Sequence, residues 1–329
     1  VGHVIRLRQG ETAVRQSQKE TGRIMYNGIM NVYKEAGFTS HDVVAKLRGI
    51  CKQKKIGHTG TLDPDAVGVL PVCFGSGTKL CDMLTDWDKE YIAVLRLGVA
   101  TDTQDLSGQV LFHADKETLS ALTEERVRAC VLDFIGDYEQ IPPMYSALKV
   151  NGKKLYELAR AGKEVERPPR TVHIRELEIL EMNIPTVRFR AVCSKGTYIR
   201  TLCHDIGEKL GCGGAMEALT RSRVGIFRIE NALRLSEIEK LRDEDKISDV
   251  IIPPDAVFGD CRGVTVMSAA CRLLENGNKI PAAMFAARDL PRDKERLRMY
   301  DEAGRFYGIY EYHAGAGEAR PVKMFLADK

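Results

Sequence analysis

The chain has 329 residues, of which 44% are hydrophobic and 29% are charged. This composition is typical of a globular protein with a packed core and excludes a largely disordered chain. Domains usually hold ~100–200 residues, so the length predicts one sizeable domain and a small second one. The net charge of +3 neither indicates nor excludes a nucleic-acid partner.

No apolar run is long enough to span a bilayer, and the N-terminus lacks the apolar stretch and cleavage site of a signal peptide. We therefore expect a cytoplasmic protein that does not associate with membranes. The nine cysteines form no Cys-x-x-Cys pair and no spaced Cys/His cluster, which favours reduced thiols and no metal site. Cys203 and His204 are adjacent, but the helical pattern around them favours a structural role over a metal or nucleophile site.

Residues 1–24 are polar and basic and precede a strand-like run at 28–32. We interpret them as an N-terminal extension, either non-native or a real basic arm, on which the fold does not depend. Thr39 or Ser40 can cap a short amphipathic helix, because apolar residues follow at helical spacing. These residues are Val43, Val44, Leu47 and Ile50.

A segment punctuated by Gly and Pro, residues 57–64, cannot continue that helix and predicts a loop. Within it, Asp63 precedes a proline that fixes the chain direction, so the carboxylate is presented from a stiff backbone. Glycines on both sides allow the backbone to approach a ligand closely. An Asp-Pro dipeptide alone, however, is more typical of an ordinary turn.

Alternating apolar residues predict strands at 91–97, 186–192 and 306–312, and helices are expected near 117–135 and 199–210. Because strands and helices do not alternate regularly, we expect an α+β fold with a mixed, largely antiparallel central sheet flanked by helices and loops.

A charged segment at 236–249, followed by two prolines, predicts a domain boundary. We place the catalytic domain at 25–252 and a small β-rich domain at 253–329.

A series of motifs in chain order resembles the TruB family of tRNA pseudouridine synthases. Residues 57–71 resemble the signature loop of the family almost residue for residue, with Asp63 in the place of the catalytic carboxylate. Further matches lie at 75–79, 89–91, 97–108, 140–162, 195–200 and 219–227. The resemblance covers roughly residues 28–230, and so many ordered motifs make coincidence negligible.

The resemblance implies the pseudouridine-synthase fold and the conversion of uridine 55 in the T loop of tRNA to pseudouridine. That reaction flips the base out, breaks the bond between the ribose and N1, and joins C5 in its place. Nothing is consumed, so no cofactor is implied. Residues 66–70 and 140–162 resemble the free-standing bacterial members, which implies no guide RNA and no obligatory protein partner. One departure is Lys34-Glu35, where the family usually has Lys-Pro, and we expect it to affect only local loop stiffness.

Family position gives Asp63, Tyr91 and Arg200 as the expected catalytic residues. Asp63 would attack the ribose or remove its 2′ proton, and both routes stay open. Arg200 would keep Asp63 ionised, and Tyr91 would stack on the uracil and accept the C5 proton. The remaining positions implied to contact RNA or to line the pocket are Lys34, His58, Gly60, Thr61, Lys79, Lys149, Tyr198 and Leu219.

The segment at about 139–170 resembles the RNA-gripping insertion of the family. Eight Lys or Arg residues against three Glu between 149 and 175 suit that role, although such a stretch is often only a solvated face. Residues 253–329 weakly resemble a PUA module, a small RNA-binding barrel, and a plain structural cap is an equal alternative.

Three other functions compete with this interpretation. Residues 74–79 lack the spacing of a Walker loop, which argues against nucleotide hydrolysis. An RNA chaperone without chemistry would not need the expected catalytic residues. A glycosidase-like hydrolase would share the carboxylate but release free uracil.

Overall fold

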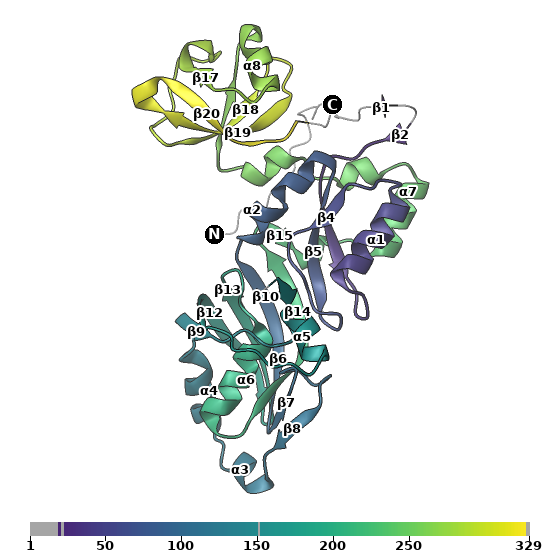
Figure 1. Cartoon of the computed structure of the whole chain (residues 1–329), viewed down its shortest axis with the longest axis vertical. Helices are drawn as coiled ribbons and strands as arrows, with labels where there is room; N and C mark the ends of the chain where they lie inside the picture. The colour runs from purple at the N-terminus through teal and green to yellow at the C-terminus, as the bar shows by residue number, and fades with distance from the viewer. Residues whose placement is uncertain (1–18, 21–22, 151, 327–329) are drawn as a thin grey trace.

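The structure, a computed structural model, describes residues 19–20, 23–150 and 152–326. A large body carries the central sheet, and a small C-terminal body sits at one end of it (Figure 1). The extension predicted for residues 1–24 lies mostly outside the described residues; of it, β1 (Lys19–Glu20) and β2 (Arg23–Ile24) are described.

The large body is built on a mixed sheet that, in the described part of the chain, has nine strands. Strands β3-β5-β14-β6-β13-β12-β9 are neighbours in that order, while β4 and β15 pair with β5 and β14. Their bounds are β3 Gly28–Lys34, β4 Ile56–His58, β5 Val67–Phe74, β6 Lys89–Leu97, β9 Gly136–Gln140, β12 Arg170–Asn183, β13 Thr186–Cys193, β14 Gly214–Val224 and β15 Phe227–Arg228. Only β5 and β14 pair in parallel, so the expected mixed, largely antiparallel sheet is confirmed.

Two pairs of helices cover the two halves of this sheet (Figure 1). Helix α1 (Ser40–Ile50) begins with a capping box at Thr39 and packs with α7 (Leu235–Asp243) over β3, β4 and β5. Helices α4 (Glu124–Leu132) and α6 (Ile199–Leu210) share the other core with β6, β12 and β13. Shorter helices are α2 Cys81–Thr85, α3 Lys116–Ser120, α5 Leu155–Arg160 and α8 Cys271–Glu275, with the 3₁₀ turn η1 at Gly75–Leu80. The predicted helix near 117–135 is therefore two helices, α3 and α4.

The charged segment at 236–249 is not a linker. Most of it is α7, which buries Leu235 and Ile238 against the α1 core. Its charges lie on the outer face of an amphipathic helix that ends the large body, and the two prolines follow it. The core of the C-terminal body begins only at Val264.

The C-terminal body is a five-stranded sheet in the order β16-β18-β19-β20-β17. The bounds are β16 Arg262–Thr265, β17 Ile280–Pro281, β18 Arg296–Tyr300, β19 Phe306–His313 and β20 Glu318–Met324. It has its own apolar core, and Ile309 and Phe325 pack onto the large body next to Leu84. The expected small β-rich domain is confirmed.

Candidate active site

Asp63 lies on the loop between β4 and β5, and its backbone is held on several sides. Leu62 is 3% exposed, and its N–H donates to Oγ of the buried Ser40 at 2.9 Å. On the other side, Nζ of Lys34 donates to the carbonyl of Pro64 at 2.8 Å. A loop fixed on both flanks presents its carboxylate with little conformational freedom, as the proline had indicated.

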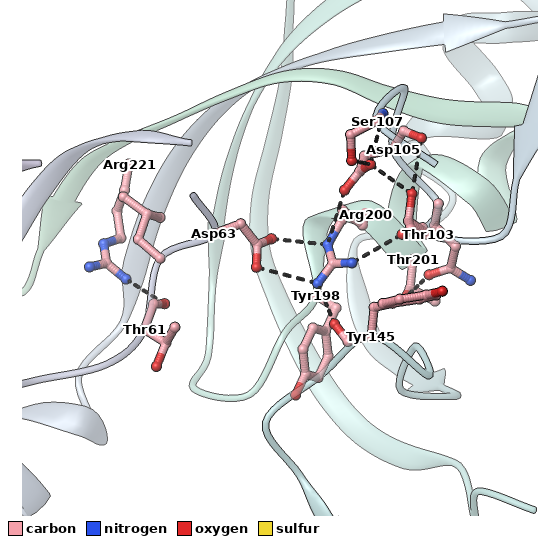
Figure 2. Close-up of polar contacts among 12 residues, drawn as sticks. Thr61, Asp63, Thr103, Asp105, Ser107, Tyr145, Tyr198, Arg200, Thr201 and Arg221 are labelled. Atoms are coloured by element: carbon pink, nitrogen blue, oxygen red, sulfur yellow. Dashed lines mark hydrogen bonds and ion pairs between the residues drawn. The ribbon is translucent and has the colours of Figure 1, made fainter. Parts of the chain in front are cut away.

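The carboxylate of Asp63 pairs with Arg200 (Figure 2). Nε of Arg200 lies 2.9 Å from Oδ2, and Nη2 lies 3.4 Å from Oδ1. The Asp63 side chain is 38% exposed and that of Arg200 only 6%. The acid therefore keeps an open face toward solvent, while the buried cation holds its other face.

Arg200 is itself held by three groups from two other segments of the chain. Its Nη1 donates to the carbonyl of Thr103 at 3.0 Å, and its Nη2 donates to that of Tyr145 at 2.8 Å. A second carboxylate, Asp105, lies 3.9 Å from Nε. Arg200 sits in the first turn of α6, whose apolar residues Ile199, Leu202, Ile206 and Leu210 are buried. The surroundings leave the guanidinium one orientation, toward Asp63.

Tyr91 and Arg221 form the floor next to this ion pair. They are directly opposite each other on β6 and β14, and Leu219 faces Ala93 one step further along the same face. Tyr91 is 9% exposed, and burial raises the pKa of its phenol, while the nearby Arg221 acts in the opposite direction. The expected pocket residues Tyr91 and Leu219 thus share one sheet face.

Arg221 is the most important residue that the sequence motifs did not single out. It is 1% exposed, and its guanidinium donates to the carbonyls of Val69, Thr61 and Gly60. These carbonyls flank Asp63 on both sides, so Arg221 clips the two ends of the loop together. The sequence feature that could have identified Arg221 is a charged residue at an inward-facing position of a strand.

Gly60 and Thr61 therefore contribute backbone carbonyls to Arg221. The Thr61 side chain is exposed beside Asp63 and available to a ligand. The sequence indicated that loop glycines let the backbone approach a ligand closely, but at Gly68 the close neighbour is the protein itself. Gly68 has a φ of +111°, and a Cβ there would lie 2.3 Å from the carbonyl oxygen of Arg221.

Lys34 is buried under the Asp63 loop, and His58 is half-buried. Lys34 is fully buried, and its ammonium donates to the carbonyls of Glu35, Phe38 and Pro64. Burial lowers its pKa to about 8. These three hydrogen bonds restrain the backbone around Glu35, the position at which the family usually has proline. Burial also lowers the pKa of His58 to about 4, so its ring is neutral at physiological pH.

Two of the expected RNA contacts lie apart from Asp63. Lys79 follows the far end of β5, an eight-residue strand that rises roughly 25 Å, and its Nζ donates to the carbonyl of Leu326. Lys149 is exposed on the hairpin of β10 (Lys149–Val150) and β11 (Lys153–Lys154). Tyr198, by contrast, lies at the start of α6, two residues from Arg200, as Figure 2 shows.

A groove of about 440 Å³ is lined in part by Tyr145, whose carbonyl accepts from Arg200. It lies between the 139–170 segment and the hairpin of β7 (Val99–Thr101) and β8 (Val110–His113). Its lining includes Asp102, Leu111, Tyr145, Lys163, Arg167 and His204. Among the described residues, no group of three or more His, Cys, Asp or Glu is arranged to hold a metal ion.

Comparison with known proteins gives consistent results. The sequence model described as TruB family pseudouridylate synthase (N terminal domain) matches residues 48–199, and the one described as tRNA pseudouridylate synthase B C-terminal domain matches residues 200–258. A tRNA pseudouridine synthase B from Lachnoclostridium phytofermentans is 53% identical over 310 residues, covering 91% of this chain and 100% of the relative. One from Francisella philomiragia is 48% identical over 297 residues, covering 89% and 93%.

Among solved structures, the archaeal box H/ACA sRNP Nop10-Cbf5 complex contains a similar chain with a TM-score of 0.67 and 23% identity, covering 92% of this chain and 87% of that one. A chain of an H/ACA RNP bound to a substrate RNA has the same TM-score and identity. At this identity the likeness concerns the fold, and it confirms the expected pseudouridine-synthase architecture.

Proposed function

The chain belongs to the TruB family of pseudouridylate synthases, and we propose that it isomerises uridine 55 in the T loop of tRNA to pseudouridine with Asp63 as the carboxylate that acts on the ribose. The enzyme is an isomerase. The supporting observation is that Asp63, on a rigid loop, keeps one face open while Arg200 holds the other.

The reaction needs a negative charge beside the sugar. When the bond between the ribose and N1 breaks, positive character develops at the anomeric carbon, and a preorganised carboxylate stabilises it. Asp63 then either attacks that carbon or removes the 2′ proton. The Arg200 ion pair orients the carboxylate for both routes.

Tyr91 is our candidate for the final proton transfer. Its phenol faces the same sheet surface as Leu219, where a flipped uracil can stack, and the C5 proton must leave once the new bond is made. Arg221, opposite Tyr91, offers the positive charge that a phenolate would need.

The target uridine lies inside a folded RNA loop, so the enzyme must also grip the RNA. The 139–170 segment is a suitable insertion for this task, because it lines the groove that includes Tyr145 and exposes Lys149 and Lys153. We assign RNA contact to this insertion and a PUA-like RNA-binding role to residues 253–329.

We also propose that the enzyme works alone, in the cytoplasm. The relatives named tRNA pseudouridine synthase B are matched over 83–100% of their length, and the 140–162 motif is of the free-standing type. In the described part of the chain, no helix has both the length and the apolar character needed to cross a bilayer.

The decisive experiment measures tritium release from C5-labelled uridine in a T-stem-loop RNA, without ATP or added metal. The Asp63→Asn variant should bind the RNA and release no tritium, because only its charge is removed. Asp65→Asn is the matched control, since Asp65 is an exposed neighbour on the same loop. RNA binding without tritium release by the unmodified protein would favour a chaperone, and free uracil would favour a hydrolase.

A further inference from the structure

Gln140 lies at the point where the insertion leaves the sheet. It is the last residue of β9, and its Cα partner on β12 is Arg170, where the insertion returns. Its side chain is nevertheless buried, at 1% exposure. A buried primary amide must find partners for both its oxygen and its nitrogen.

Besides a contact with Tyr138, the amide forms hydrogen bonds with both backbone groups of a single residue. Nε2 of Gln140 donates to the carbonyl of Tyr198 at 3.0 Å, and the N–H of Tyr198 donates to Oε1 at 2.8 Å. This two-point contact fixes the orientation of the Tyr198 backbone as well as its position. It also joins two segments 58 residues apart in the sequence.

The clamped residue is the one that starts the helix of Arg200. Tyr198 is the N-cap of α6, and its own side chain makes no capping hydrogen bond. The first turn of α6 is therefore oriented from outside, by Gln140. The same insertion reaches Arg200 a second time, since the carbonyl of Tyr145 accepts from Nη2 at 2.8 Å.

We infer that Gln140 is a positioning residue for the reaction, one that orients the first turn of α6 so that Arg200 meets Asp63, and that couples this geometry to the base of the RNA-gripping insertion. The inference rests on the proposed function. A bare role in stability is the competing explanation, and it predicts loss of folded protein without a specific loss of turnover.

The chain supplies a matched control in Gln53. It is 3% exposed and clamps one backbone in the same way: Tyr26 N–H donates to Oε1 at 2.8 Å, and Nε2 donates to the Tyr26 carbonyl at 2.9 Å. Tyr26 lies just before β3, on the α1 side of the molecule and away from α6. Comparing the same substitutions at positions 53 and 140 therefore distinguishes the loss of a backbone clamp in general from the misalignment of Arg200 in particular.

The test measures kcat and KM for a T-stem-loop RNA with Gln140→Glu, Gln140→Ala and the two equivalent Gln53 variants, all checked for thermal unfolding. Both Gln140 variants should lower kcat by roughly tenfold to a hundredfold, the effect expected of about an ångström of misalignment. KM should stay within about twofold of the parent value, because the substitutions affect the alignment of Arg200 and not the ground-state binding of RNA. The Gln53 variants should keep kcat while losing a comparable amount of stability.

Gln140→Glu adds a readout that a structural role would not produce. An ionised carboxylate at this position has no donor for the Tyr198 carbonyl, so two acceptors would face each other. A protonated carboxyl group restores one donor and one acceptor. Burial raises the pKa of a carboxyl, so the kcat of this variant relative to Gln140→Ala should rise as pH falls from 8 to 5.5. The titratable neighbours are Tyr138, Asp205 and Tyr198, and Tyr138 contacts the Gln140 side chain. Gln140→Ala, which adds no titratable group, is therefore the reference for the pH dependence.

Each outcome decides the inference. A selective kcat loss with partial recovery at low pH supports it. An unchanged kcat, a loss confined to KM, a flat pH ratio, or equal kcat losses at positions 53 and 140 would overturn it. The proposed function stands or falls separately, on Asp63→Asn.

Discussion

Nε of Arg200 lies 2.9 Å from Oδ2 of Asp63, although 137 residues separate the two in the sequence. Only the cation is buried; the acid remains partly exposed. The ion pair therefore holds a carboxylate that a substrate can still reach. In a purely structural buried salt bridge, both partners would be shielded from solvent.

Replacing Arg200 with lysine should lower kcat by roughly a hundredfold while RNA affinity is kept. Lysine retains the charge but cannot serve Asp63, Thr103 and Tyr145 at once from a planar fork. Single-turnover rates and RNA binding measure the two effects. Arg96→Lys, at an exposed pair with Glu217, is the control, and a loss at position 200 no larger than this control would contradict the prediction.

Tyr91→Phe should keep the aromatic face and remove the proton acceptor. Turnover should therefore fall by at least about a hundredfold, the usual contribution of a general base, with little change in affinity. Tyr310→Phe, which removes a buried hydroxyl in the C-terminal body, should leave turnover unchanged. Equal losses of turnover and affinity at Tyr91 would count against its role as the base.

Gly68→Ala tests how tightly the loop is held against β14. The added methyl would lie 2.3 Å from the Arg221 carbonyl oxygen, at a φ of +111°. Gly211→Ala is the comparison, because Gly211 has a φ of +75° and open space around it. We expect about 1–2 kcal/mol lost at position 211 from backbone strain alone, and about 2 kcal/mol more at position 68 from the clash. Denaturant unfolding checks the difference, and equal losses would show that the loop yields.

His58 should make the protein less stable in mild acid. Its folded-state pKa is about 4, against an ordinary value of 6.5, because of burial and the nearby charges of His41 and Arg221. As pH falls from 6.5 toward 4, the unfolded chain binds a proton that the folded chain does not, so the free energy of unfolding decreases.

In His58→Gln this decrease should shrink, and the shape of the activity profile between pH 5 and 8 should not change. Unfolding at several pH values and an NMR titration of the ring measure both expectations. A ring that titrates near pH 6.5 in the folded enzyme would disprove this account.

Local patterns predicted the elements well wherever their periodicity was strong. Helix α1 begins at Thr39 with its predicted apolar face, and β6, β13 and β19 lie where the alternation placed them. Helix α7 was not predicted from the segment at 236–249, because a dense run of charge looks the same in a loop and on the outer face of a helix. Lys34 and Lys79 show a related limit, since a lysine that donates to backbone carbonyls has the same letter as one that contacts phosphate.

The sequence by itself determined the family, the α+β fold and the loop that presents Asp63, because these depend on long, ordered motifs and on local backbone preferences. Only the tertiary structure decided that Arg221 clips the two ends of this loop and that Gln140 holds the start of the Arg200 helix. Both contacts join a side chain to backbone carbonyls or amides of distant segments. Every residue carries those backbone groups, so no pattern of side chains can reveal which of them a buried donor will reach.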